Sequence, residues 1–201
     1  MANSSRAPTD NQRTIAAYES YAQEYDKIVE AAPSEHVRKG LRELAAATGE
    51  GARILEIGSG CGRDADFIET LGVQVHRTEP AEAFLELQRA RGKTAHMLDV
   101  VEDELGGPYD GVMVMCVLFH IERAAIDAVL RKLADALRPG GGFLVSMREG
   151  EGETRGEYLM TYWSRDDFAA RLEQAGLVVE WDYRHLGRKD ERWFTLLARR
   201  T

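Results

Sequence analysis

Apolar positions recur at helical spacing near the start of the chain. They include Ile15, Tyr18, Ala22 and Tyr25 and predict a helix over residues 14–31, which Pro33 ends. A second helical pattern follows over residues 34–47 and stops at a glycine. Residues 1–13 are polar and show no such spacing, so we expect a disordered leader there.

From residue 53 the pattern changes to short apolar runs that alternate with helical segments. Such an alternation is typical of a parallel, doubly wound sheet with helices on both faces. The continuous apolar run over residues 111–117 is typical of a strand buried on both faces. Strands are predicted at 53–57, 73–77, 93–98, 111–117 and 142–147, and helices at 64–71, 80–90 and 124–137.

The last third of the chain has a different texture. Residues 148–163 are charged, glycine-rich and aromatic, which predicts a long lid loop. A helix is expected over 164–175, and two strands over 177–183 and 192–198 are joined by a short turn. We therefore predict one Rossmann-like α/β domain over residues 14–201. Its mostly parallel sheet has seven strands with an antiparallel strand at the C-terminal end, and residues 14–48 form a helical cap.

Composition narrows the classes of function. The chain has 201 residues, of which 26 are Lys or Arg and 34 are Asp or Glu, so its net charge is -8. This balance argues against nucleic acid and anionic membranes as partners. No targeting segment and no apolar run of about 20 residues is visible. Cys61 and Cys116 are far apart and show no metal-ligand spacing. We expect a cytoplasmic protein without a metal.

A glycine loop between the first strand and the next helix is the most informative segment. Gly58, Gly60 and Gly62 allow a sharp turn and a close approach of a ligand to the backbone. The loop lacks the GxGxxG spacing that dinucleotide folds use. Glu56 just before it would repel a pyrophosphate and would suit a ligand with a positive charge, such as an amine or a sulfonium.

Two more acidic residues follow successive predicted strands. Glu79 ends the second strand, where a carboxylate in such folds accepts hydrogen bonds from ribose hydroxyls. Asp99 follows the third strand, and its carboxylate together with the Val100 N–H could recognise an adenine edge. Since ligands of these sheets bind at the carboxyl ends of the strands, we expect Glu56, Glu79 and Asp99 to serve one site.

Five segments in order resemble the class I S-adenosylmethionine-dependent methyltransferases, over about residues 14–200. They are Ile54 to Asp64, Thr78-Glu79-Pro80, Leu98-Asp99-Val100, Tyr109 to Cys116, and Leu137-Arg138-Pro139-Gly140-Gly141. The resemblance implies S-adenosylmethionine as cofactor.

The resemblance also implies residue roles. The glycine loop, with Ser59 in it and Glu56 behind it, would hold the methionine moiety, and Glu79, followed by Pro80, would bind the ribose. Asp99 and Val100 would contact adenine, and the Cys116 carbonyl would face the α-amino group. Tyr25, and next Tyr18, matches a tyrosine that covers the cofactor in relatives. These residues form the predicted cofactor site.

Two departures from the family pattern matter. Ala81 stands where a serine contact is usual after the second strand. The Asn-Pro-Pro-Tyr type of motif found in enzymes that methylate nucleobase amines is replaced by Cys116-Val117-Leu118-Phe119. These departures disfavour DNA amino-methylation and favour a small-molecule acceptor.

Candidate catalytic residues lie after the fourth and fifth strands. His120 is the candidate base, because an imidazole can accept a proton near neutral pH; the alternative is a packing role. Arg155 and Tyr158 in the lid could pair with an acidic acceptor and stack on it; the alternative is a solvated loop. Asp64 is interpreted as a helix cap, with contact to the cofactor amine as the other possibility.

These observations predict methyl transfer from S-adenosylmethionine to an oxygen or nitrogen atom of a small organic acceptor, for example a secondary metabolite. Three alternatives stay open. The acceptor can be a peptide or another macromolecule. The protein can be a nicotinamide-dependent oxidoreductase, against which Glu56 and the loop spacing argue. It can also be a non-catalytic cofactor-binding partner, for which a degraded glycine loop would be the marker.

Overall fold

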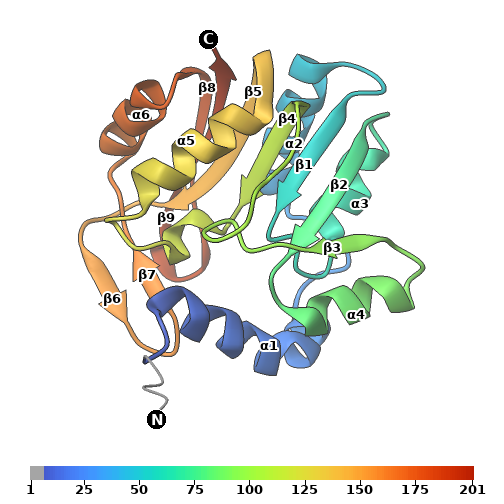
Figure 1. Ribbon diagram of the computed structural model, residues 1–201, viewed down its shortest axis with the longest axis vertical. Helices are drawn as coiled ribbons and strands as arrows, with labels where there is room; N and C mark the ends of the chain where they lie inside the picture. Colours follow the sequence, from blue (N-terminus) through green and yellow to red (C-terminus); the bar gives the residue numbers. More distant parts are fainter. Residues whose placement is uncertain (1–6) are drawn as a thin grey trace, which may run out of the picture.

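A seven-stranded mixed sheet forms the centre of the computed structural model, which describes residues 7–201 (Figure 1). The strand order is β3-β2-β1-β4-β5-β9-β8. The first five strands run parallel, and β9 is antiparallel to both of its neighbours. The strands are β1 (Arg53–Ile57), β2 (Gln74–Glu79), β3 (Ala95–Met97), β4 (Tyr109–Met115), β5 (Leu137–Arg148), β8 (Leu177–Leu186) and β9 (Arg192–Arg200). The predicted Rossmann-like α/β sheet with its antiparallel C-terminal strand is confirmed.

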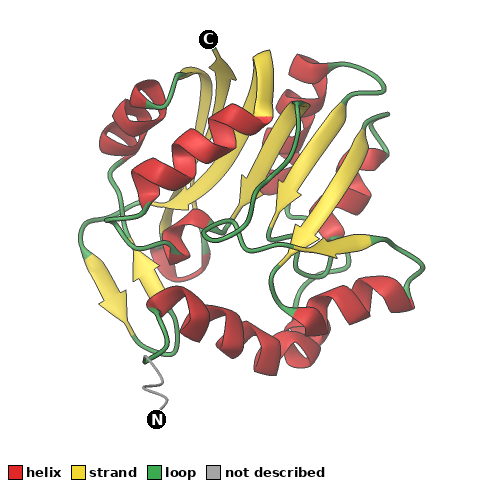
Figure 2. Cartoon of the chain, viewed as in Figure 1, coloured by secondary structure: helices red, strands yellow, loops and turns green. Residues whose placement is uncertain are grey.

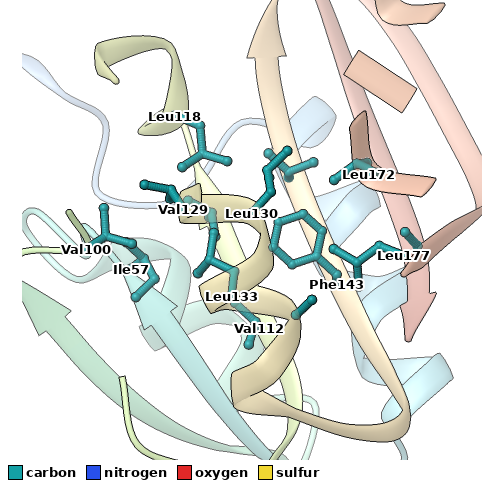
Figure 3. Packing of buried hydrophobic residues seen from close by; sticks show 14 of the residues in the cluster. Ile57, Val100, Val112, Leu118, Val129, Leu130, Leu133, Phe143, Leu172 and Leu177 are labelled. Atoms are coloured by element: carbon teal, nitrogen blue, oxygen red, sulfur yellow. The ribbon is translucent and has the colours of Figure 1, made fainter. Parts of the chain in front are cut away.

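Helices cover both faces of the sheet (Figure 1). The helices α5 (Ile126–Ala136) and α6 (Arg165–Gln174) pack on one face, where side chains such as Leu130 and Leu133 meet Phe143 in the larger core (Figure 3). The helices α2 (Glu35–Thr48) and α3 (Arg63–Glu69) pack on the other face around Leu44 and Met113. These two apolar layers hold the strand ends in fixed positions.

The order of the strands reverses between β1 and β4, which lie side by side at the centre. β1 leads into the glycine loop at Gly58, and β4 leads to Cys116. In open α/β sheets the crevice at such a switch point is where ligands bind. The fold therefore brings together two segments that are almost sixty residues apart in the sequence.

The helix α1 (Asp10–Ile28) runs along the carboxyl ends of the strands, next to α4 (Glu82–Ala90) (Figure 1). It begins at Asp10, so the predicted leader is wrong for residues 10–13; residues 1–6 lie outside the described part. The reason is a capping box: the Thr9 side chain accepts from the Gln12 N–H, and the Gln12 side chain accepts from the Thr9 N–H.

Only the first of the two N-terminal helices covers the edge of the sheet. α2 begins after the capping Ser34, and its buried Leu41 and Leu44 pack against the sheet face together with Ile54. The predicted cap over residues 14–48 therefore consists of α1 alone, because the apolar side chains of α2 are buried against the face of the sheet.

The predicted lid loop is partly ordered as a β-hairpin. β5 continues to Arg148, and β6 (Glu153–Arg155) then pairs antiparallel with β7 (Leu159–Thr161) (Figure 2). The expectation of a loop over residues 148–163 is wrong because the backbone groups of two three-residue strands pair with each other in spite of the glycines around them. The hairpin packs against α1, where the Leu159 N–H donates to Thr14 Oγ1 at 3.3 Å.

Among residues 7–201, no helix is both long and apolar enough to cross a membrane.

Candidate functional site

A cavity lies between α1 and the carboxyl ends of the central strands, and we call it the edge cavity. It is lined mainly by one face of α1 and by residues that follow β1, β2, β3 and β4. The lining consists of Asn11, Thr14, Ile15, Tyr18, Tyr25, Ile57, Gly58, Gly60, Glu79, Pro80, Ala81, Phe84, Leu98, Asp99, Val100, Met115, Cys116, Val117, His120 and Ile121. Most of the predicted cofactor residues are thus in one place.

The glycine loop approaches the edge cavity at Gly58 and Gly60. Gly58 has a φ of +67°, and a Cβ there would lie 2.5 Å from Val117 Cγ2, so only glycine fits. Gly62 lines no part of the cavity, and its predicted contact with the cofactor stays a prediction. It begins α3 with a φ of +76°, and a Cβ there would lie 2.6 Å from Gln88 Oε1. The absence of a side chain at Gly62 therefore leaves room for the Gln88 side chain.

Glu79 is a buried carboxylate at the end of β2, and it faces the edge cavity. It accepts hydrogen bonds from the Gly60 N–H at 2.8 Å and the Ala81 N–H at 3.0 Å. Burial raises the pKa of Glu79 to about 7, although these two N–H groups oppose the shift. The carboxylate therefore holds the glycine loop in place and keeps lone pairs for hydroxyl donors.

Asp99, Val100 and Pro80 all line the cavity as predicted. The Asp99 carboxylate accepts from the Val101 N–H at 2.9 Å and from Asn11 Nδ2 at 2.6 Å, and so joins the loop after β3 to the first turn of α1. Asn11 was missed because it fell in the predicted leader. The Thr9 to Gln12 capping box is the sequence signal that could have found it.

Aromatic side chains from α1 form the roof of the cavity. Tyr18 and Tyr25 both line it, and each packs against Phe84 of α4, with ring centroids 6.3 and 5.7 Å apart. Burial raises the pKa of both phenols, to about 12 for Tyr25. Both hydroxyls are protonated at neutral pH and can donate hydrogen bonds.

His120 lines the cavity but has partners at both ring nitrogens. Nδ1 lies 2.7 Å from the Leu159 carbonyl oxygen, which can only accept, so Nδ1 carries the proton. Nε2 lies 3.0 Å from Tyr18 Oη and accepts from that hydroxyl. Burial lowers the pKa of His120, so the imidazole is neutral at pH 7.

The lid residues do not reach the cavity. Arg155 is 53% exposed and donates to Asp10 at 2.9 Å and to Glu153, so its guanidinium is already paired and its predicted contact with an acceptor stays a prediction. The hairpin turns this side chain toward the start of α1 instead. Tyr158 stacks on Tyr18, with ring centroids 5.3 Å apart, and supports the roof without lining the edge cavity.

Glu56 lines neither the edge cavity nor the neighbouring cavity that is described below. It lies on the sheet face that α3 covers, because side chains of a strand alternate and Ile54 packs there. It is 3% exposed, and its Oε2 has no hydrogen-bond partner. Burial, helped by the nearby Asp64 carboxyl, raises its pKa well above the ordinary range, while Arg77 opposes the shift. Its predicted contact with the cofactor stays a prediction, which this burial behind the loop does not support.

Cys116 lies where two cavities meet. Its backbone has a φ of +60°, and its N–H donates to Ser146 Oγ at 2.8 Å, which holds the end of β4 in position. The side chain is accessible from the cavity, and desolvation by the residues packed around it raises the pKa of the thiol to about 11, so it is neutral at pH 7. The residue lines the edge cavity and also its neighbour.

The neighbouring cavity lies along the connection between α1 and α2, and we call it the linker hollow. It shares Tyr25, Gly58, Gly60, Met115 and Cys116 with the edge cavity. Its other lining residues are Ile28, Val29, Glu30, Ala32, Pro33, Ser34, Val37, Ser59, Cys61, Arg63, Asp64 and Arg188. Ser59 is thus near the site, but its hydroxyl already accepts from Gln88 Nε2 at 2.8 Å.

Asp64 does not cap α3, contrary to the preferred sequence interpretation. The N-cap is Gly62, and no side chain makes the capping hydrogen bond. Asp64 lies in the first turn and faces the linker hollow. Burial raises its pKa to about 6, against the effect of the neighbouring Arg63 guanidinium.

The described residues contain no group of three or more His, Cys, Asp or Glu side chains arranged to hold a metal ion. Charged side chains of the edge cavity in residues 7–201 are the acids Glu79 and Asp99. The cavity at the switch point thus combines a glycine loop with acids at the strand ends, an arrangement that favours a ligand with positive charge over one with negative charge.

Comparison with known proteins agrees. Residues 55–143 match the family described as a methyltransferase domain. The protein-L-isoaspartate O-methyltransferase of Azoarcus sp. (strain BH72) is 29% identical over 125 residues, which are 58% of this chain and 51% of that protein. The ubiquinone biosynthesis O-methyltransferase of Xanthomonas oryzae pv. oryzae (strain PXO99A) is 31% identical over 104 residues, which are 48% and 43% of the two chains. The chain thus matches about half the length of these relatives.

The whole length of this chain has the same fold as a solved structure. It is the 1,6-didemethyltoxoflavin-N1-methyltransferase of Burkholderia thailandensis, with 1,6-didemethyltoxoflavin and S-adenosylhomocysteine bound. It superposes with a TM-score of 0.76 at 20% identity and covers 100% of this chain and 93% of that one. Residues 55–143 of the chain are thus similar to a methyltransferase domain, and the chain as a whole has the fold of a methyltransferase that was solved with S-adenosylhomocysteine bound. These likenesses argue against the nicotinamide-dependent alternative.

Proposed function

We propose that this protein transfers the methyl group of S-adenosylmethionine to an oxygen or nitrogen atom of a small organic acceptor. One observation carries the proposal: the edge cavity and the linker hollow meet at Gly58, Gly60 and Cys116. A ligand in one cavity can therefore touch a ligand in the other, at the point where the two central strands end.

The residues of the edge cavity fit the cofactor. Glu79 would present its buried carboxylate to the ribose hydroxyls, and Asp99 and Val100, which line the same cavity, would contact the adenine. Tyr25 closes the cavity from above. The acids and the neutral His120 leave the cavity negative, which favours a sulfonium over its neutral product and over a diphosphate.

When bound, the cofactor supplies a methyl group on positively charged sulfur, which already has a good leaving group. The chain then has to align the acceptor atom and keep water out. α1 covers the strand ends, and rigid β1 and β4 fix the two walls. The acceptor gains the methyl group and loses one proton. His120 Nε2 is the proposed receiver once Tyr18 turns away, for an acceptor atom that extends from the linker hollow past Gly58 and Cys116 into the edge cavity, which His120 lines.

The linker hollow is the proposed acceptor site. Its wall toward α1 and α2 is formed largely by apolar side chains such as Val29, Pro33 and Val37, which suit a compact apolar body. Arg188, on the turn between β8 and β9, also lines the hollow and would suit an anionic substituent placed away from the acids Glu30 and Asp64. These features favour a small molecule.

The test has two stages. Calorimetry first measures binding of S-adenosylmethionine and S-adenosylhomocysteine to the purified protein. The protein is then incubated with S-adenosylmethionine and separate panels of phenols, small carboxylic acids, amines, an isoaspartyl peptide and RNA, and product mass is followed. We expect a gain of one methyl group in a member of the small-molecule panels.

Three outcomes would contradict the proposal in different ways. Absence of cofactor binding would remove the whole function. Turnover of the isoaspartyl peptide or RNA alone would replace the small acceptor by a macromolecule, an alternative to which the Azoarcus relative lends weight. Tight binding without turnover of any panel would favour the non-catalytic partner.

A further inference from the structure

We propose that the open face of the sheet at β2 and β3 carries a second binding site, which takes a phosphate group, either free phosphate or that of a small phosphate ester. The site lies beside the amino ends of β1 and β2, whereas the edge cavity lies at the carboxyl ends of the same strands. It is therefore separate from the proposed site of methyl transfer and does not depend on that proposal.

The first reason is that no helix covers this part of the sheet. β3 ends at Met97 and β4 begins at Tyr109, and the connection between them contains no helix. α5 packs over β4 and β5 instead (Figure 1). His76 pairs in register with Leu55, which belongs to the core on the α5 side of the sheet. The side chains that β2 and β3 direct to this side are therefore accessible to a ligand.

The second reason is a hollow on this face, which we call the basic pocket. Its lining residues are Arg53, Gln74, Val75, His76, Arg77, Thr94 and His96. Within residues 7–201, no Asp or Glu lines it, although the net charge of the chain is -8. Arg77 pairs with Asp66 and Glu69 of α3 on the other face, so the positive charge of the pocket comes from its remaining basic side chains.

The third reason is that the guanidinium of Arg53 is free to bind an anion. In the described part of the chain it makes no hydrogen bond or ion pair, and it lies over the Tyr109 ring, 5.5 Å from the centroid. The neighbouring Asp110 carboxylate is engaged by Arg138 at 2.5 Å and by the backbone N–H of Arg53 at 2.8 Å. A guanidinium presents its N–H groups in a fork that matches a phosphate group.

The fourth reason is the pair of imidazoles beside Arg53. The ring centroids of His76 and His96 are 4.7 Å apart. The Tyr109 hydroxyl donates to the Leu105 carbonyl at 3.3 Å and lies 3.4 Å from His76 Nδ1, so it can accept from that nitrogen. Nε2 of a protonated His76 is then the atom that donates to an anion.

The charges around His76 show what the basic pocket lacks. Burial, together with the neighbouring His96 and Arg53, lowers the pKa of His76. The groups that face this imidazole from β1, β3 and β4 are thus two basic side chains and a phenol. A bound phosphate group would turn the repulsion between the basic side chains into attraction.

A metal ion is the other ligand that two histidines could bind. The Arg53 guanidinium beside them would repel a cation, and residues 7–201 offer no third His, Cys, Asp or Glu arranged to complete a metal site. The charge of the pocket therefore favours an anion.

The experiment follows the imidazole signals of all five histidines by NMR at pH 6, while inorganic phosphate is added at constant ionic strength. Each signal is assigned from its loss in a variant that has Gln at that position. We expect the signals of His76 and His96 to move and to saturate. Those of His36, His120 and His185 lie outside the basic pocket and should stay in place as internal controls.

A second titration with glycerol 3-phosphate distinguishes the two sources of the phosphate group. Tighter binding of this ester would assign the site to an organic phosphate, and tighter binding of inorganic phosphate would assign it to the free ion. Both results support an anion site. The pKa of His76, read from its own titration curve, should rise when either ligand is present, because an anion stabilises the imidazolium.

Two variants with the same loss of charge form the matched comparison. Arg53→Gln should weaken phosphate binding about 10-fold, the low end of the range for a charged hydrogen bond, because the pocket is open to solvent. Arg131→Gln removes a charge from α5 outside the basic pocket, and its affinity should stay within twofold of the wild type. If Arg53→Gln does not fold, His96→Gln takes its place, and binding observed at His76 should weaken several-fold.

Three results would overturn the inference. They are no saturable movement of the His76 and His96 signals at pH 6, equal movement of all five signals, and equal phosphate affinities of Arg53→Gln and Arg131→Gln. A response of the two signals to zinc ions but not to phosphate would also overturn it and would identify a metal site. All of these results leave the methyltransferase proposal standing.

Discussion

The hydroxyl of Tyr18 lies 3.0 Å from Nε2 of His120, whose other nitrogen donates to the carbonyl of Leu159. One imidazole thus joins three parts of the structure: α1, the segment after β4 and the β6–β7 hairpin. All three border the edge cavity or its roof. The contact makes His120 a structural link and a proton acceptor at the same atom, and the two roles can be separated.

The first prediction separates these roles of His120. Tyr18→Phe keeps the imidazole and frees Nε2, so turnover should change only a few-fold. His120→Ala removes the acceptor, and turnover should fall by about 10²-fold or more, the usual contribution of a general base. Initial rates with saturating cofactor measure both. Similar rates for the two variants would reduce His120 to a packing residue.

The second prediction concerns the adenine end of the cavity. Asp99→Ala should weaken binding of S-adenosylhomocysteine by about 1–3 kcal/mol, because a polar partner is lost in a partly buried site. Asn11→Ala removes the 2.6 Å contact from α1 but leaves the carboxylate, so its effect should be smaller. Calorimetry on both variants is the measurement. Equal effects would mean that Asp99 acts by docking α1 alone.

The third prediction compares two glycines of one loop. A Cβ at Gly58 would clash with Val117 at 2.5 Å, whereas a Cβ at Gly60 would meet nothing within 4 Å. Gly58→Ala should therefore lower the free energy of unfolding by about 2–4 kcal/mol through strain and overpacking. Gly60→Ala, which carries backbone strain alone, should lower it by about 1 kcal/mol. Urea titrations check the order, and the reverse order would contradict the loop geometry.

The fourth prediction concerns pH and Glu79. Its pKa is about 7 in the folded protein and about 4.3 in an unfolded chain, so the folded state binds more protons between these values. The free energy of unfolding of the ligand-free protein should therefore fall as pH rises from about 4.5 to 7, by at most about 1.4 kcal/mol per pH unit for this one group.

Glu79→Gln should make this decline shallower, while the remaining shifts at Glu56 and Asp64 keep part of it in the same direction. Urea unfolding at pH 5, 6, 7 and 8 is the measurement, with the exposed Glu82→Gln as control. An unchanged slope in Glu79→Gln would show that burial does not shift this carboxyl.

The spacing of apolar residues along the chain was enough to predict the architecture of the sheet and its helices. The alternation of short apolar runs with helical stripes predicts the doubly wound sheet, because the period of buried positions follows from the geometry of strands and helices themselves. The glycine loop and the acids Glu79 and Asp99 do border one cavity, as their positions predicted, while their contacts with the cofactor stay a prediction. They follow strand ends, and parallel strands bring their carboxyl ends to one edge of the sheet.

Only the tertiary structure decided which side chains work together at that edge. Both nitrogens of His120 are occupied by groups 102 and 39 residues away in the sequence. Asp64 faces the hollow and Glu56 does not, because α3 covers the face of the sheet to which Glu56 points. Contacts between distant segments depend on how elements pack, and residue spacing along one strand or helix carries no record of them.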